Sequence, residues 1–218
     1  MKQLILKELS LCLHPTSLIF LSFAALVFVP NYPYEVIFFF SGLSVFFTCL
    51  TARENGDLAF TAALPAPKGA IPLARMAVTM GFQILLLALV GALGALKAAL
   101  LPAELLINEA GLSANWALVG NGALLLGAFN LLFFPRYFRR PDRVGGPFAA
   151  ASAVLFLLIG LLIALRWTLP LFSVTLNGSN AEHTGAKLIA MAAGLVLYAG
   201  LSALACLLSV RRFLKTDL

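Results

Sequence analysis

The residues that could do chemistry in this sequence are few and scattered. Glu182 and His183 form an acid–histidine pair, but the other histidine, His14, lies far away in the chain. The three cysteines have no paired spacing, and neither a GxxxxGK[ST] phosphate loop nor an HExxH zinc motif is present. The sequence therefore predicts no catalytic, cofactor or metal site in this chain, and it places the Glu182–His183 pair in a solvated loop.

Composition defines the class of protein. Of the 218 residues, 61% are hydrophobic and 11% are charged, and the mean hydropathy is +0.99. Soluble domains average about 45–50% apolar and about 25% charged residues. These values exclude an ordinary soluble enzyme, a disordered protein and a disulfide-stapled module, and they predict a polytopic membrane protein. The net charge of +6 does not indicate a nucleic-acid partner, because the basic residues form no single face or run.

Six apolar segments approach the length that a membrane-spanning helix needs. They are residues 16–29, 36–51, 76–96, 116–134, 148–165 and 188–210. None contains Asp, Glu, Lys, Arg or His, and all 11 prolines lie outside them, which we take as support for these helix boundaries. The predicted fold class is an all-α membrane protein with six transmembrane helices.

The basic residues predict an orientation. If both termini are cytoplasmic, only Lys97, Arg166 and Lys187 of the 15 Lys and Arg residues lie outside. Cytoplasmic loops carry such an excess of Lys and Arg, so we predict a multi-pass protein with N- and C-termini in the cytoplasm. Arg166 and Lys187, at the outer ends of their spans, are expected to extend toward the lipid headgroups.

These boundaries give one transmembrane domain, residues 1–218. Its parts are an interfacial helix (1–15), spans one and two (16–51), a long inner loop (52–75), spans three and four (76–134), a second inner loop (135–147), spans five and six (148–210) and a tail (211–218). In the N-terminal helix one face can hold Leu4, Ile5, Leu9 and Cys12, while Lys2, Lys7 and Glu8 lie off that face. This pattern favours a helix lying in the membrane interface over the start of the first span.

The long inner loop contains more than a connection requires. A short helix from about Glu54 to Leu64 is predicted, ending at the Leu64–Pro65 step. Its apolar residues Leu58, Phe60 and Leu64 need cover, either on the membrane surface or in a groove of a partner protein.

The remaining polar residues allow two interpretations each. Gln83 and Asn121 lie within spans, where they either hydrogen-bond between helices or line a substrate path. Ala190 and Gly194 form a small-xxx-small step that permits close helix approach. In the second inner loop, the arginines either attract anionic lipid or form a secondary contact with a cytoplasmic partner. These are Arg136, Arg139, Arg140 and Arg143.

At the long inner loop the sequence resembles the small six-span permeases of ABC-2 type exporters, including bacterial subunits linked to export of peptides and antibiotics. In that family an acidic residue, a Leu-Pro step and two basic residues follow the second span. Here these are Glu54, Leu64–Pro65, Lys68 and Arg75. The Lys7-Glu8-Leu9 stretch is similar to the family's interfacial elbow helix.

The resemblance implies a permease subunit of an ATP-driven exporter in the bacterial plasma membrane. Two separate ABC ATPase subunits would hold ATP and Mg, so this chain would bind no cofactor and would not itself be an enzyme. The loop would act as a coupling helix that contacts the ATPase through Glu54, Asp57, Leu58, Phe60, Leu64, Pro65 and Lys68. A second permease chain, identical or related, would complete the path of a hydrophobic or amphipathic cargo, such as a peptide or lipid-like compound. The alternative is a non-catalytic membrane immunity or assembly subunit.

Overall fold

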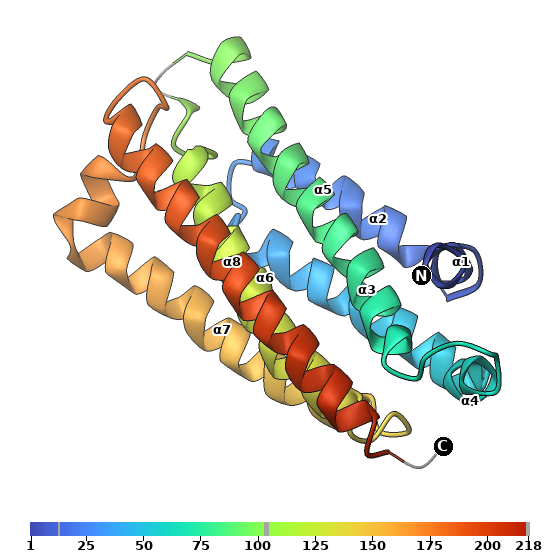
Figure 1. The fold of residues 1–218 in the computed structure, drawn as a ribbon. Coiled ribbons are helices and arrows are strands. Elements are labelled where there is room, and N and C mark those ends of the chain that lie inside the picture. Colours follow the sequence, from blue (N-terminus) through green and yellow to red (C-terminus); the bar gives the residue numbers. More distant parts are fainter. Residues whose placement is uncertain (13, 103–104, 217–218) are drawn as a thin grey trace.

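Helices make up almost all of the computed structural model, which describes residues 1–12, 14–102 and 105–216 (Figure 1). In chain order they are α1 (Lys2–Lys7), the π-helix η1 (Glu8–Cys12), α2 (Thr16–Ser22), the 3₁₀-helix η2 (Phe23–Phe28), α3 (Val36–Glu54), α4 (Asp57–Ala62), α5 (Ala70–Leu100), α6 (Trp116–Tyr137), α7 (Gly145–Thr168), the π-helix η4 (Leu171–Thr175) and α8 (Thr184–Phe213). Within the described residues there is no β-strand, and an isolated antiparallel bridge joins Ile107 to Ser113. Residues 13 and 217–218, which the sequence assigned to the interfacial helix and the tail, lie outside this description.

Five helices are long and apolar enough to cross a membrane, namely α3, α5, α6, α7 and α8. The short α2–η2 segment follows α1 and η1 after a bend of 86°, and the bent pair counts as a sixth span if it is taken as one. The chain is therefore an all-α polytopic membrane protein, as predicted, and six is the upper count of its spans.

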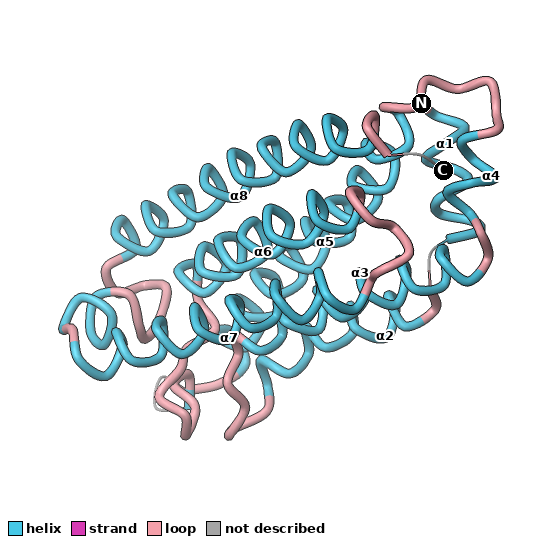
Figure 2. Tube along the Cα trace, turned by 90° about the horizontal axis from the view of Figure 1, so that it is seen from below, coloured by secondary structure: helices cyan, strands magenta, loops and turns pink. Residues whose placement is uncertain are grey.

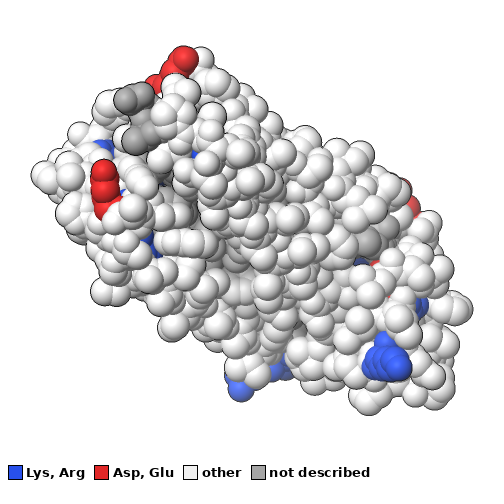
Figure 3. All heavy atoms as spheres, turned by 90° about the horizontal axis from the view of Figure 1, so that it is seen from above, with Lys and Arg blue, Asp and Glu red and all other residues white. Residues whose placement is uncertain are grey.

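The ends of the bundle are distinct from its middle. The first helix, α1, and the last turn of α8 lie at the same end, as two directions of view show (Figures 1 and 2). On the face drawn in Figure 3, a broad band of surface without charged side chains separates the charges near one end from those near the other. Such a band is what contact with the apolar interior of a bilayer requires.

The helices extend beyond the apolar segments, and three of them contain proline. Pro72 and Pro147 lie in the first turns of α5 and α7, where the missing N–H has no helical acceptor in any case. Pro135 lies in the last turn of α6. These prolines lie outside the predicted apolar segments but inside the helices, so they do not mark the helix boundaries.

The bundle packs around α6, the most buried of its spans. A Cβ added to Gly194 of α8 would overlap the carbonyl oxygen of Gly120 on α6, and one added to Gly120 would lie 2.8 Å from the Cα of Met191. Small residues thus bring two helix backbones into direct contact. The Ala190–Gly194 step noted in the sequence lies at this contact.

A buried aromatic column runs along α6 toward the end that also holds α1 and α4. The rings of Phe129 and Phe133 stack with their centroids 5.3 Å apart, and Phe133 stacks on Tyr137 at 5.6 Å. All three side chains are fully buried. The column places the Tyr137 hydroxyl where four segments of the chain meet.

Candidate functional site

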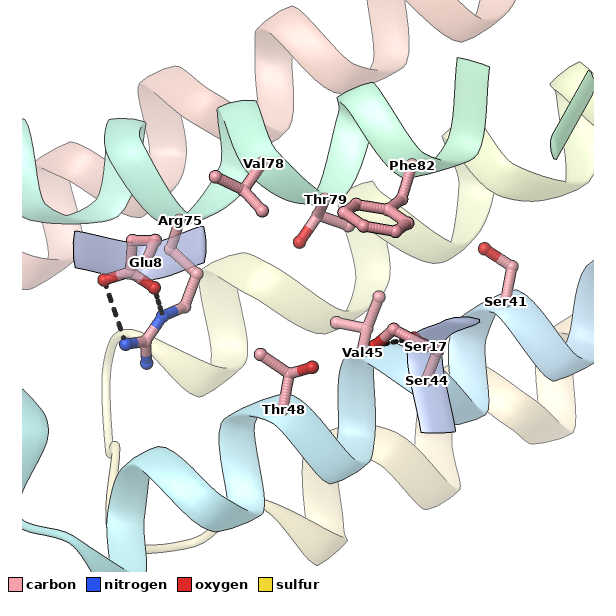
Figure 4. Close-up of a pocket in the computed structure, with 10 residues that line it drawn as sticks. All are labelled: Glu8, Ser17, Ser41, Ser44, Val45, Thr48, Arg75, Val78, Thr79 and Phe82. Carbon is pink, nitrogen blue, oxygen red and sulfur yellow. Dashed lines mark hydrogen bonds and ion pairs between the residues drawn. The ribbon is translucent and has the colours of Figure 1, made fainter. Parts of the chain in front are cut away.

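A buried arginine near the start of α5 is the centre of the candidate site. Arg75 is only 1% exposed. Its Nε donates a hydrogen bond to Glu8 Oε2 at 2.8 Å, and its Nη2 donates to Glu8 Oε1 at 3.2 Å, which makes a bidentate pair (Figure 4). Its Nη1 donates to the Tyr137 hydroxyl at 2.9 Å. One side chain therefore joins the N-terminal segment, α5 and the end of α6.

The same arginine also holds the short helix of the long loop. Arg75 Nη2 donates to Asp57 Oδ2 at 2.5 Å. The other oxygen of Asp57 accepts from Lys7 Nζ at 2.7 Å, and Lys7 also donates to Thr61 Oγ1 at 2.9 Å. Lys7 lies 2.9 Å from Glu8 Oε1, so the ion pairs close into one cluster. We call Lys7, Glu8, Asp57 and Arg75 the ion cluster.

Local backbone geometry sets the cluster members in place. Gly56 adopts a left-handed conformation with φ of 61°, which ends the run of α3 and starts α4 in a new direction. Asp57 is then the first residue of α4 and faces α5. The sequence predicted one helix from Glu54 to Leu64. That prediction is wrong, because α3 continues through Glu54 and α4 covers only Asp57–Ala62.

The N-terminal helix turns its charges inward. Glu8 is 3% exposed and faces the bundle on the same side as buried Leu4, one helical turn away. Leu6 and Leu9, by contrast, are exposed. The expectation that Glu8 lies off the face that holds Leu4 is thus wrong, because Glu8 pairs with Arg75 of α5. The side chain of Cys12 lies outside the described part of the chain.

The ion cluster is electrostatically balanced, with two cationic and two anionic side chains. Their side-chain exposures range from 1% for Arg75 to 11% for Lys7. Removing a charge from water has a large desolvation penalty, which close, hydrogen-bonded partners of opposite charge must offset. The cluster meets this condition because every carboxylate oxygen has a cationic donor. Loss of one member would leave its partners buried without compensation.

A narrow slot lined by hydroxyl groups begins at the ion cluster and runs between α2, α3 and α5 (Figure 4). Helix α3 supplies Ser41, Ser44 and Thr48, which are spaced to share one face. Ser44 Oγ donates to Ser17 Oγ of α2 at 2.7 Å, and Thr79 of α5 completes the polar lining. The slot offers hydrogen-bonding groups within an otherwise apolar bundle.

The loop residues expected to contact a partner fall into two groups. Leu58 is 5% exposed and packs inward, so it holds α4 against the bundle. Phe60 and Leu64 are 62% and 38% exposed on the outer side. The loop thus exposes apolar side chains on the side of α4 that faces away from the bundle, while Leu58 packs against the bundle.

The polar residues of the loop also differ in their surroundings. Glu54 is exposed and lies 3.6 Å from Arg53 in a loose ion pair. Pro65 is exposed beyond the end of α4. Lys68 Nζ donates to the backbone oxygen of Thr216 at 2.6 Å, so it ties the start of α5 to the end of α8.

Comparisons with family models, with curated proteins and with solved structures found no match to this chain. The candidate site therefore rests on its own geometry. Within the part of the chain that the structure describes, no three His, Cys, Asp or Glu side chains are grouped so that they could hold a metal ion.

Gln83 belongs to a polar cluster in the middle of the bundle. It is fully buried and exchanges two hydrogen bonds of 2.8 Å with Asn130 of α6. Asn130 also donates to Ser202 Oγ at 3.0 Å, and the Tyr198 hydroxyl donates to Gln83 Oε1 at 3.0 Å. Of the two interpretations of Gln83, hydrogen bonding between helices is therefore the one observed, and Gln83 joins α5, α6 and α8. Asn121 is half-buried and lies outside this cluster.

At the opposite end of the bundle, basic side chains turn back onto the protein. Arg166 Nη2 donates to Glu35 at 3.0 Å, and Lys187 donates to the backbone oxygens of Ser179 and Glu182. The expectation that Arg166 and Lys187 extend to lipid headgroups is therefore wrong, because both side chains donate to acceptors on neighbouring loops of the protein.

The junction between α3 and α5 at this end depends on Tyr34. Lys97 Nζ donates to the Tyr34 hydroxyl at 2.8 Å and to the Val27 backbone oxygen at 3.0 Å. Tyr34 lies in the turn before α3 and is fully buried, and this burial raises the pKa of its hydroxyl to about 12. Tyr34 thus remains a neutral acceptor at physiological pH.

Sequence reasoning missed the role of Tyr137 and the pairing within the ion cluster. Lys7, Glu8, Asp57 and Arg75 each attracted attention singly, but they are separated by up to 68 positions and no spacing rule joins them. The one signal available was that each is a charged residue beside an apolar segment, which predicts partners only when the fold is known.

Proposed function

We propose that this chain is the membrane-spanning permease subunit of an ATP-driven exporter of the ABC-2 type. The observation that carries the proposal is the attachment of α4. A six-residue helix in an inter-span loop is joined by ion pairs to α5 and to the N-terminal helix, while its outer side exposes Phe60. A helix of this length has little stability of its own, so its rigidity comes from these tertiary contacts.

Such a helix suits the transfer of force. A partner that binds Phe60 and Leu64 and then moves would displace α4 as a unit. Asp57 would pass that displacement to Arg75 and hence to the end of α5, and Lys7 and Glu8 would pass it to the N-terminal helix. The hydroxyl-lined slot between α3 and α5 starts at the same point, so the displaced helices border polar groups that can exchange hydrogen-bond partners.

The energy source lies in separate subunits under this proposal. Two cytoplasmic ABC ATPase subunits bind ATP and Mg, and each one docks on the loop of a permease chain. A second permease chain, identical or related, faces this one across the path of a hydrophobic or amphipathic cargo. The membrane is the bacterial plasma membrane, and the end that carries α1, α4 and the last turn of α8 faces the cytoplasm.

The test is to purify the tagged chain from its native host in mild detergent and identify its partners by mass spectrometry. We expect a stoichiometric ABC ATPase with the native chain and none with Phe60→Asp. The matched control is Leu214→Asp, which places the same charge on another exposed apolar side chain at the same end of the bundle. It should retain the ATPase.

Two results would contradict the proposal. Full ATPase association and cargo-stimulated ATP hydrolysis in Phe60→Asp would remove α4 as the coupling element. A folded chain that copurifies with no ATPase would favour the alternative, a non-catalytic immunity or assembly subunit, because such a protein needs only spans and a docking surface.

A further inference from the structure

A basic hollow lies where α6 and α8 end. It is bordered by side chains from both helices and the loop after α6, which are far apart in the sequence. These are Arg136, Arg139, Arg140, Arg212 and Lys215. The sequence grouped Arg143 with the arginines of this loop, but Arg143 does not line the hollow, whereas Arg212 and Lys215 from the chain end do.

The cations of the hollow have no acidic partner within residues 1–12, 14–102 and 105–216. Two of them are held in position by backbone oxygens instead. Arg212 Nη1 donates to the oxygen of Pro135 at 3.0 Å, and Arg136 Nη1 donates to the oxygen of Leu132 at 2.7 Å.

The bond from Arg212 also satisfies a carbonyl at the end of α6, that of Pro135. The last carbonyl groups of a helix have no partner within it and carry partial negative charge. They therefore attract arginines to this point. Mutual repulsion among the gathered cations remains, and a bound anion would relieve it.

We propose that this hollow binds the phosphate of an anionic phospholipid headgroup. The phosphate oxygens would accept hydrogen bonds from the guanidinium groups, which match phosphate geometry well. A lipid rather than a free anion is the occupant because the hollow adjoins the membrane-facing surface. Leu208 of α8 and Leu132 of α6, each half-buried, lie one helical turn before Arg212 and Arg136 on the same faces, and they offer apolar surface to acyl chains.

The inference is independent of the exporter proposal. It requires only that the ends of α6 and α8 lie at headgroup level, which their charge-free apolar spans already demand. It also gives the second loop and α4 different roles. The loop arginines would bind lipid, and the exposed surface of α4 would bind a protein.

The test measures lipid retention by native mass spectrometry on the full-length chain. The chain is exchanged from detergent into nanodiscs of phosphatidylglycerol or of phosphatidylcholine and is then released with its bound lipids. We expect phosphatidylglycerol to be retained and phosphatidylcholine to be lost. Each arginine near an anionic headgroup contributes about fivefold to affinity, so Arg139→Gln/Arg140→Gln should weaken phosphatidylglycerol binding roughly 25-fold.

The matched control is Arg143→Gln/Arg211→Gln, which removes the same total charge at the same end of the bundle, one arginine from this loop and one from α8, without touching the hollow. It should bind phosphatidylglycerol as the native chain does. Arg139 and Arg140 are exposed, so their replacement should leave the thermal midpoint unchanged, and both double variants are compared at equal folded fractions.

Equal losses in the two double variants would overturn the site, because diffuse surface charge would then explain the binding. A separate arm adds inorganic phosphate at millimolar concentration. If phosphate displaces the lipid at a concentration no higher than that of the lipid, the hollow is a site for a free anion. The lipid proposal would then fail.

Discussion

The two sides of the bundle are packed in different ways. Between α6 and α8, glycines bring the backbones into contact, and the cluster of Gln83, Asn130 and Ser202 joins three helices. Between α2, α3 and α5 lies a narrow slot lined by hydroxyl groups, and the ion cluster closes one end of it. The first side has no room to move without breaking backbone contacts. The second side has a cavity of about 30 Å³, enough for about one water molecule, and polar groups that can exchange hydrogen-bond partners.

Helix α5 belongs to both sides. Its middle is tied to α6 and α8 through Gln83, and its end is tied to α4 through Arg75. A force applied at α4 would therefore act on the end of a helix whose middle is held. If the exporter proposal is right, α5 bends or tilts about Gln83 while the α6–α8 pair stays rigid. The predictions below test this division.

The largest effect should follow removal of the cation that closes the slot. Arg75→Met leaves Glu8 and Asp57 buried and close together, so the variant should lose about 3–5 kcal/mol of stability. Thermal unfolding in detergent measures the loss. The matched control is Arg143→Met, because Arg143 is exposed and has no ion pair among the described residues, and its midpoint should stay close to that of the native chain.

A combined variant sharpens this result. In Lys7→Met/Glu8→Gln/Asp57→Asn/Arg75→Met the charges of the whole ion cluster are removed together, so much of the lost stability should return. The same low midpoint in the single and the quadruple variant would mean that the ion pairs themselves, and not the uncompensated charges, hold this end together.

The glycine contact should give the next largest effect. Gly194→Ala places a methyl group against the Gly120 carbonyl, and overpacking of this kind costs about 1–3 kcal/mol. Gly200→Ala on the same helix is the control, since its added Cβ meets nothing within 4 Å and alanine favours the helix. Equal unfolding midpoints for the two variants would contradict a rigid α6–α8 contact.

The sequence predicted the fold class because composition and span length are read locally. The five long spans each contain a predicted apolar segment, and the errors lie at their ends, where Pro72, Pro135 and Pro147 are inside helices. The break at Gly56 was missed because a glycine near a polar stretch can equally remain in a helix, and only the direction of α4 required the left-handed conformation.

The candidate site was predictable residue by residue but not as a unit. The amphipathic pattern placed Lys7 and Glu8 off the apolar face of the N-terminal helix. No local rule reveals that Asp57 and Arg75 pair with them. The pairing of Gln83 with Asn130 is similar, since a polar residue within a span indicates a partner without saying which one. Long-range pairing depends on how the helices cross, and spacing along the chain does not encode that crossing simply.

A smaller effect should come from the mid-bundle cluster that anchors α5. Asn130→Leu removes the amide that pairs with Gln83, and hydrogen bonds of this kind between membrane helices contribute about 1–2 kcal/mol. Asn121→Leu is the control on the same helix, because Asn121 lies outside the cluster. Unfolding in detergent should separate the two, and a larger loss in Asn121→Leu would contradict the anchoring role of Gln83.

The smallest effect concerns the side of the bundle formed by α2, α3 and α5. It tests whether this side is also held together at the end away from the ion cluster, where Tyr34 lies. Burial raises the pKa of Tyr34 to about 12, above the ordinary value of about 10 for a tyrosine, so the folded state holds this proton more tightly than the unfolded state. The stability that this provides is complete below pH 10 and is lost as the pH rises from about 10 to about 12. Between pH 8 and pH 11 the native chain should therefore lose about 1 kcal/mol that Tyr34→Phe does not lose, because phenylalanine has no proton to release. Parallel stability–pH curves for the two chains would show that the Tyr34 hydroxyl is not buried at the junction of α3 and α5, and the slot would then be held at the ion cluster alone.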